Sequence, residues 1–504
     1  MRARLIAFTL ALALGAGAAQ AQDPLAAIDW LRDGLSLPSG IEEAPVTDTA
    51  APANIDVTAI DRPSPDAVGL LPSGVTGLPD DLWGRSAASD LARRLAGLGP
   101  GLLPEMRRLL FRVLVSELRP PADSGPEGLL FLARVDTLIA FGALDPAKAL
   151  LERAGTETPE SFARLFDAAL LTGTENDACD TLRRRPELSS DYTARVFCLA
   201  RGGDWDAAAL TLEVARALDF IPIFEDALLT RFLDPVLFEG VPPLVPPESP
   251  SPLVFRMSDA LGDPIPTARL PLAFAQSDLR ESRGWKAQIE AAERLARSGA
   301  VPANRLLGLY TQRQAAASGG VWDRVVAVQQ LEAALDSRDP SRVAPALVNA
   351  WRTMAGIGLE PVLAELFAPR VDGLTLPPEV SALAFRMTLL TDDFADTARS
   401  GASEADRFLA ALAQGRPGDV AAPNPTAGAI ADGFRMTSAP ARLDGLIQDN
   451  RLGEALLRAM DLIENGARGD LDELTDALAF LRATGFETSA RRVALEILIL
   501  DPRG

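Results

Sequence analysis

The sequence predicts an all-α fold in which helix hairpins stack as an α-solenoid behind an extended N-terminal arm. Three observations lead to this prediction. From about residue 86 onward, apolar residues recur with the helical period. Similar segments return at intervals of roughly 30 to 40 residues, which is typical of stacked helix hairpins. Alternating β-branched runs bounded by tight-turn pairs, the usual strand signal, are scarce.

Residues 1–21 have the pattern of a secretory signal peptide. Arg2 and Arg4 precede a short apolar run, and an A-x-A cleavage site spans Ala19 to Ala21. We therefore expect cleavage near Ala21 and a periplasmic location, with an uncleaved membrane anchor as the alternative. Because no later segment reaches the ~18 uninterrupted apolar residues of a membrane span, none is expected after removal of the signal.

Residues 22–85 are predicted to form a Pro-rich arm with a short helix near its start. Ile28, Trp30 and Leu31 lie within an apolar helical pattern, and the residues after it are rich in Pro, Gly, Asp, Thr and Ala. Such a composition buries too little apolar surface to fold alone. These three residues are the candidate partner contacts. The short helix either docks back onto the helical body or binds a partner as a helix in a groove.

Residues 86–234 are predicted to form the first array of helical repeats. Three segments share one plan, in which an apolar helix, a Gly-containing turn and an Ala-rich helix follow one another. Alanines at matching places in the second helices lie 31 and then 29 residues apart, at Ala147, Ala178 and Ala207. Small side chains at these places let two helices approach closely, which favours stacked hairpins.

Residues 275–415 are predicted to form a second array. Trp285, Trp322 and Leu359 fall at steps of 37 residues after Gly-containing turns. The Gly-Gly-x-Trp-Asp sequence around Trp322 also occurs around Trp205. We expect all three tryptophans to pack in the repeat core; the alternative is that they line a groove.

Proline-rich stretches are predicted to divide the helical part of the chain. Ten prolines fall between Pro235 and Pro271, so residues 235–274 are expected to connect the two arrays without long helices. Residues 416–440 are predicted to be a shorter linker. Residues 441–504 are expected to be C-terminal helices that close the stack.

The repeats resemble tetratricopeptide units. The resemblance rests on the glycine or small residue at the first turn, the alanines of the second helix and a spacing near 34 residues, and it covers most of 125–400 and the last 60 residues. It implies a surface for binding a protein or peptide. The layout of signal peptide, Pro-rich arm and helical hairpins is also similar to that of periplasmic motility proteins that support the flagellar stator.

Cys179 and Cys198 are predicted to form a structural disulfide. They are the two cysteines of the chain and lie 19 residues apart, and an exported chain meets an oxidising compartment. The alternative, a redox-active pair, lacks a Cys-x-x-Cys motif. Cys179 falls in the second helix of one hairpin and Cys198 in the first helix of the next, so the bond would join neighbouring repeats.

The composition excludes several classes of function. With no histidine, Ser-His-Asp and Cys-His nucleophiles and His-ligated metals are ruled out. A net charge of −20 argues against binding nucleic acid or an anionic membrane surface. We therefore predict no catalytic residue, no cofactor and no metal ligand.

Short acidic motifs are the remaining candidates for a catalytic or metal-binding role. Lytic transglycosylases combine an α-superhelix with a Glu-Ser catalytic motif, and Glu-Ser pairs begin here at Glu160, Glu248 and Glu281. None is followed by the Gly-Leu-Met-Gln-like segment of those enzymes, so chance occurrence is the favoured interpretation. The pairs Asp80-Asp81 and Asp392-Asp393 lack EF-hand spacing and are interpreted as turns or helix N-caps.

The sequence thus predicts a non-enzymatic periplasmic scaffold that binds a protein or peptide partner in an envelope assembly, with the flagellar motor as one setting. Two alternatives remain open. One is a protein that binds or cleaves peptidoglycan, which would bring contact with the cell wall. The other is a periplasmic holdase for unfolded exported chains.

Overall fold

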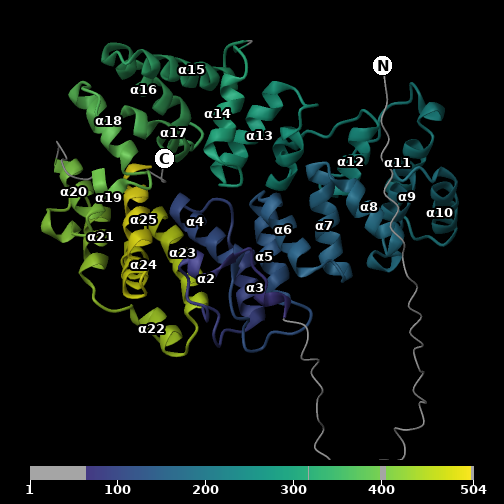
Figure 1. Cartoon of the computed structure of the whole chain (residues 1–504), viewed down its shortest axis with the longest axis horizontal. Helices are drawn as coiled ribbons and strands as arrows, with labels where there is room; N and C mark the ends of the chain where they lie inside the picture. The colour runs from purple at the N-terminus through teal and green to yellow at the C-terminus, as the bar shows by residue number, and fades with distance from the viewer. Residues whose placement is uncertain (1–63, 316, 398–403, 501–504) are drawn as a thin grey trace, which may run out of the picture. The chain divides into compact units, whose positions relative to one another are not determined.

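The computed structural model describes residues 64–315, 317–397 and 404–500. In these ranges the fold is all-α, as predicted, and is built of neighbouring helices packed in pairs (Figure 1). The predicted signal peptide and the candidate contacts Ile28, Trp30 and Leu31 lie outside the described residues.

The first described elements include one short parallel strand pair. In chain order they are η1 (Pro65–Ala67), β1 (Leu71–Pro72), α2 (Ser73–Thr76), α3 (Ala88–Gly97), α4 (Pro104–Val115) and β2 (Ser116–Glu117). In the pair, Leu71 lies opposite Ser116. Glycine is required at Gly69 because a Cβ there would lie 2.1 Å from the backbone nitrogen of Glu117.

Residues 64–85, which the sequence assigns to the arm, pack into the core instead. Leu82 and Trp83 are fully buried, and the carbonyl of Leu82 accepts a 2.7 Å hydrogen bond from the backbone N–H of Gly453. A Cβ on Gly453 would lie 2.7 Å from the ring of Trp83, so this glycine permits the close approach. The prediction of an arm is wrong for residues 64–85, because turns separate their apolar residues and the sequence therefore shows no helical period.

Three helix pairs follow, as the first repeat pattern predicts. Their bounds are α5 (Leu129–Ala140) with α6 (Leu144–Ala154), α7 (Pro159–Thr172) with α8 (Glu175–Arg184), and α9 (Tyr192–Arg201) with α10 (Trp205–Ala217). Ala147 and Ala178 are buried in second helices, as expected. In α10 the fully buried alanines are Ala208 and Ala215, and Ala207 is half-buried.

The predicted disulfide between Cys179 and Cys198 is confirmed. It joins α8 to α9, with 4.8 Å between the two Cα atoms. Both cysteines are buried in the core of the first array. The bond therefore links the second helix of one pair to the first helix of the next.

The elements of the Pro-rich connection are short. They are η3 (Pro235–Phe238), α12 (Pro252–Ala260), η4 (Thr267–Arg269) and η5 (Leu272–Leu279), after α11 (Ile223–Leu233). Pro252 occupies the first turn of α12, where a missing N–H costs nothing. α12 packs against α7 and α11, and η5 packs against α7 and α13 (Trp285–Arg297). The connection thus contacts both arrays.

The second array explains the spacing of 37 residues. α13 pairs with α14 (Ala303–Thr311), α15 (Val321–Ser337) with α16 (Pro340–Ala355), and α17 (Glu360–Val371) with α18 (Pro378–Thr388). Trp285 and Trp322 lie in the first turns of α13 and α15, and Leu359 is the N-cap of α17. The first helices of the three repeats therefore begin within one residue of a regular 37-residue spacing.

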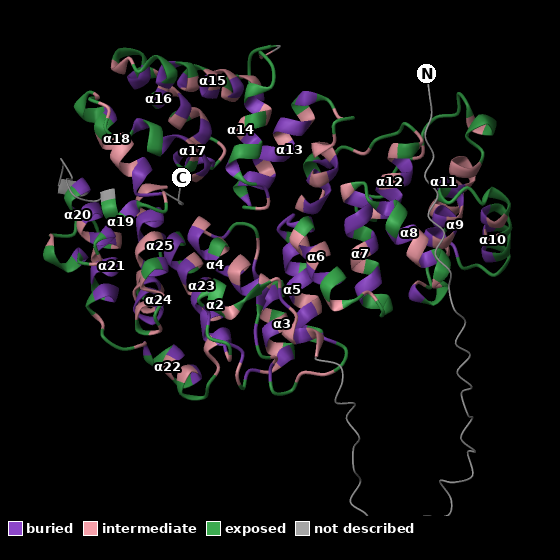
Figure 2. Cartoon of the chain, viewed as in Figure 1, coloured by how far each residue is buried: buried purple, intermediate pink, exposed green. Residues whose placement is uncertain are grey.

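The last elements return to the beginning of the described chain. They are α19 (Phe394–Thr397), α20 (Glu404–Ala413), η6 (Pro417–Asp419), α21 (Pro425–Arg435), α22 (Ala441–Gln448), α23 (Leu452–Arg468), α24 (Leu471–Ala483) and α25 (Glu487–Ile499). α23 packs against α3, and α25 packs against α4 (Figure 1). The expectation that residues 416–440 form only a linker is wrong, because α21 lies within them and packs against α24 in the core. One core holds apolar residues of 78–151 together with those of 389–497, and in Figure 2 buried residues run along these helices.

Candidate functional site

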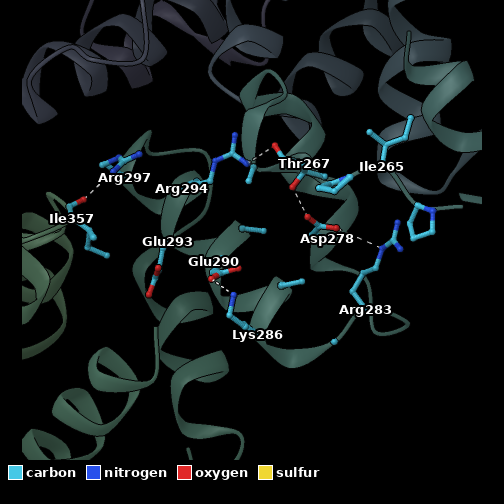
Figure 3. A pocket seen from close by; sticks show the side chains of 16 residues that line it. Ile265, Thr267, Asp278, Arg283, Lys286, Glu290, Glu293, Arg294, Arg297 and Ile357 are labelled. Carbon is cyan, nitrogen blue, oxygen red and sulfur yellow. Dashed lines mark hydrogen bonds and ion pairs between the residues drawn. The ribbon is translucent and has the colours of Figure 1, made fainter. Parts of the chain in front are cut away.

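A cavity of about 770 Å³ lies between the Pro-rich connection and α13 (Figure 3). Its apolar lining comes from Ile265 and neighbouring prolines, from alanines of α13 and from Ile357, which precedes α17. Charged side chains of α13 stand around this lining. The cavity therefore joins residues that are distant in sequence at the boundary between the two arrays.

Hydrogen bonds to backbone carbonyls hold the walls of the cavity. The guanidinium of Arg294 donates to the carbonyls of Thr267 (2.9 Å) and Leu270 (3.1 Å). On the other side, Arg297 donates to the carbonyl of Ile357 at 3.1 Å (Figure 3). Burial, and next the charge of Arg297, lower the pKa of Arg294. These arginines thus fix the connection and the α16–α17 turn against α13.

An ion-pair network that includes two residues of the cavity wall, Asp278 and Arg283, joins the connection to the first array. Arg256 of α12 donates to the buried carboxylate of Glu175 at 2.9 and 3.0 Å and to Asp259 at 3.0 Å. Asp259 also pairs with Arg283 at 2.7 Å, and Arg283 lies 3.6 Å from Asp278. Because these charges are largely screened from solvent, breaking one pair would leave its partner uncompensated.

Every carboxylate on the cavity wall has a partner. Glu290 pairs with Lys286 at 2.6 Å, and Glu293 accepts hydrogen bonds from Tyr310 (2.8 Å) and Arg324 (2.6 Å). Burial, and next the charge of Glu293, raise the pKa of Tyr310 well above its usual value. The cavity thus offers apolar contact and paired charges, which suits the binding of a peptide segment.

A second candidate is an exposed apolar surface on the last helix of the first array and the segment after it. Within the described residues, ten of the fourteen exposed large apolar side chains fall between 205 and 245. Ile223 is 92% exposed, Val245 87% and Leu210 66%. We call this set the apolar surface: Trp205, Leu210, Val214, Leu218, Phe220, Ile223, Val236, Leu237, Val241 and Val245. Such concentrations usually mark interaction sites.

The prediction for the three tryptophans holds for only part of the set. Trp285 is buried and Trp322 half-buried, and their ring centroids lie 5.0 Å apart. Trp205 is 50% exposed, with its centroid 6.4 Å from that of Phe232, so its assignment to the core is wrong. The shared motif misleads because Trp205 begins the second helix of its pair, whereas Trp322 begins a first helix.

The structure does not bring the Glu-Ser pairs together. Glu160 is exposed in the first turn of α7, while Glu248 and Glu281 are exposed in the loops before α12 and α13. None of the three lines the cavity of Figure 3.

The acidic pairs lie in turns, as expected, and have arginine partners. Asp80 lies 2.6 Å and Asp81 4.0 Å from the guanidinium of Arg119. Asp392 pairs with Arg492 and lies 3.7 Å from Arg108.

Sequence reasoning missed both candidate sites. The cavity has no local signal because its walls come from separate segments. The apolar surface does have one, since Leu210, Val214 and Leu218 recur every four residues in addition to the buried stripe of α10.

No protein-family model, curated protein or solved structure matches the chain. Among the helices of the described ranges, none combines the length and apolar character that crossing a membrane requires. In the same part of the chain, no three acidic or cysteine side chains gather as a set of metal ligands.

Proposed function

We propose that the chain is a non-enzymatic scaffold of the periplasm that binds a protein or peptide partner in an envelope assembly. The observation that carries this proposal is the apolar surface between residues 205 and 245. Exposing so many large apolar side chains has a cost in water, and a binding partner removes it. The cavity beside α13 adds a second place where a peptide segment fits.

The signal-peptide pattern and the disulfide support the periplasmic setting, because a disulfide persists in an oxidising compartment. The flagellar motor is the assembly that we propose on layout, by similarity to periplasmic stator-supporting proteins. The helical pairs agree with a tetratricopeptide-like arrangement. The segment around Ile28, Trp30 and Leu31 is a further proposed contact with the partner.

In-cell crosslinking of a C-terminally tagged chain, followed by mass spectrometry, tests the proposal. We expect a few envelope proteins in stoichiometric amounts. A Trp30→Ala, Leu31→Ala variant run beside it asks whether the N-terminal segment is needed. Recovery of only scattered exported chains would overturn the scaffold function in favour of a holdase.

Peptidoglycan binding or cleavage is the other alternative function, and separate experiments distinguish it from the scaffold function. Co-sedimentation with purified peptidoglycan, and loss of a wall-cleaving activity in Glu160→Gln or Glu281→Gln, would overturn the proposal. We expect neither, because neither carboxylate lines the cavity or belongs to the apolar surface.

A further inference from the structure

We propose that the apolar surface binds a basic amphipathic helix of the partner protein. The apolar side of that helix would lie along α10, and its lysines and arginines would face the acidic residues around α10. This inference rests on the proposed scaffold function and specifies the surface and the chemistry of the partner.

The apolar residues of α10 form a stripe that matches a helix. Leu210, Val214 and Leu218 are 66%, 46% and 53% exposed, and a spacing of four residues puts them on one face. The stripe is about 12 Å long, or two helical turns. In the described structure α10 packs against α9 and α11. A straight stripe of this kind accommodates a partner helix by ordinary helix–helix packing.

The second helices of the two earlier repeats carry no such exposed apolar stripe. The second helices α6 and α8 are each packed against the next pair, through α7 and α9. Neither carries a large apolar side chain among the exposed ones of the described chain. After α10 the chain turns into α11 and the Pro-rich connection. α10 likewise packs against α9 and α11, so the stripe lies on a face of α10 that these neighbouring helices leave exposed.

The segment that carries the apolar surface has a negative net charge, which bears on the kind of partner helix. Residues 204–248 contain nine acidic residues and two arginines, Arg216 and Arg231. Arg216 is already paired with Glu213 and with Asp226, which lies 2.6 Å away. Arg231 donates to the carbonyl of Pro242 at 2.8 Å. The exposed acidic residues of α10 and the segments that flank it are Asp204, Asp206, Glu213, Asp219, Asp234 and Glu239.

This excess of negative charge favours a cationic partner, since complementary charge steers and orients association. It disfavours a second copy of the chain. In a symmetric dimer the same acidic residues would face each other across the contact.

Binding of synthetic helices to the full mature chain tests the inference. The probe is a fluorescently labelled Leu-Lys amphipathic peptide of about 18 residues, or five turns. Its two controls are a Leu-Glu peptide with the same apolar face, and a Leu-Lys peptide of identical composition whose order destroys that face. By fluorescence anisotropy we expect at least tenfold tighter binding of the amphipathic Leu-Lys peptide than of either control. Equal binding of all three would overturn the inference.

Surface variants locate the site. We expect Leu210→Ser, Val214→Ser, Leu218→Ser to weaken binding of the Leu-Lys peptide at least tenfold. The exposed Val348→Ser, on α16, is the matched control and should leave it unchanged. Unchanged binding to the triple variant, or a concentration-dependent dimer that this variant abolishes, would overturn the inference.

The same triple variant separates this inference from the scaffold function. Crosslinked envelope partners that are retained by the triple variant would leave the scaffold function standing and overturn the assignment to α10. If the unmodified chain recovers no specific partner, the scaffold function itself fails, whatever the peptides do.

Discussion

The guanidinium of Arg134 lies fully buried among backbone carbonyls. It donates five hydrogen bonds of 2.7 to 3.2 Å to the carbonyls of Asp66, Val68, Leu114 and Ser116. Burial lowers its pKa to about 10, so the side chain stays protonated at neutral pH. One residue of α5 thus holds the segment before β1 and the end of α4 together.

Arg134→Lys is expected to lower the free energy of unfolding by at least about 3 kcal/mol, because a single ammonium cannot satisfy four separated carbonyls. Urea unfolding monitored by circular dichroism measures this. The control is Arg153→Lys, whose exposed ion pair with Glu117 contributes about 1 kcal/mol or less. Equal stability of the two variants would contradict this account of Arg134.

Glu496 is a residue of α25 whose carboxyl group is buried against the start of α4. Its Oε2 accepts a 3.0 Å hydrogen bond from the backbone N–H of Glu105 at the start of α4. Burial raises the pKa of Glu496 to about 8, although this hydrogen bond acts in the opposite direction. At neutral pH the folded chain therefore keeps a proton on Glu496 that the unfolded chain, with a pKa near 4.3, releases.

The free energy of unfolding therefore falls as the pH rises. The stability from this proton is fully present below about pH 4.3 and is lost as the pH rises through 8. Between pH 5 and 7.5 this group lowers the free energy of unfolding by about 1.4 kcal/mol per pH unit. Glu496→Gln should remove that slope in urea titrations, and the exposed Glu379→Gln should not. A slope that survives in Glu496→Gln would assign it to other groups.

At the scale of elements, the disulfide between α8 and α9 closes a short loop. In the chain-entropy model a loop of 19 residues contributes roughly 3 kcal/mol. We expect Cys179→Ser, Cys198→Ser to lower the free energy of unfolding by roughly 2 to 4 kcal/mol. The shift in electrophoretic mobility on reduction should also vanish in Cys179→Ser. A mobility shift that persists in that variant would point to another pairing.

Helical period and repeat spacing predicted many of these elements. The pairs α5 to α10 and the first turns of α13 and α15 stand where the glycines, alanines and tryptophans indicate. The burial of residues 64–85 could not be predicted from the sequence, because Leu82 and Trp83 are buried where they contact Gly453, which is far along the chain. The cavity and the exposure of Trp205 also depend on which element packs over which face. No local pattern encodes that choice.

At the scale of the whole described chain, three large cores separate. One holds α3 to α6 together with α20 to α25, the second holds α13 to α18, and the third holds α7 to α12. The fully buried Leu495 belongs to the first core and the fully buried Leu331 to the second. A destabilising substitution in α25 should therefore promote local unfolding of α4, which is distant in sequence, more than local unfolding of α15.

Leu495→Ala tests this division. We expect a loss of about 2 to 5 kcal/mol, with faster hydrogen–deuterium exchange in α4 and little change in α15 and α16. Leu331→Ala should give the reverse pattern. Exchange in α4 that is unaffected by Leu495→Ala would show that the two helices unfold independently.

The contact between α4 and α25 has a consequence for the growing chain. Glu105 accepts a hydrogen bond from Ser489, 384 residues later. At about 5 to 20 residues per second, synthesis of that interval takes roughly 20 to 80 s. During this time α3 and α4 exist without the helices that cover their apolar faces. The unfinished chain therefore exposes apolar surface that proteases and chaperones can reach.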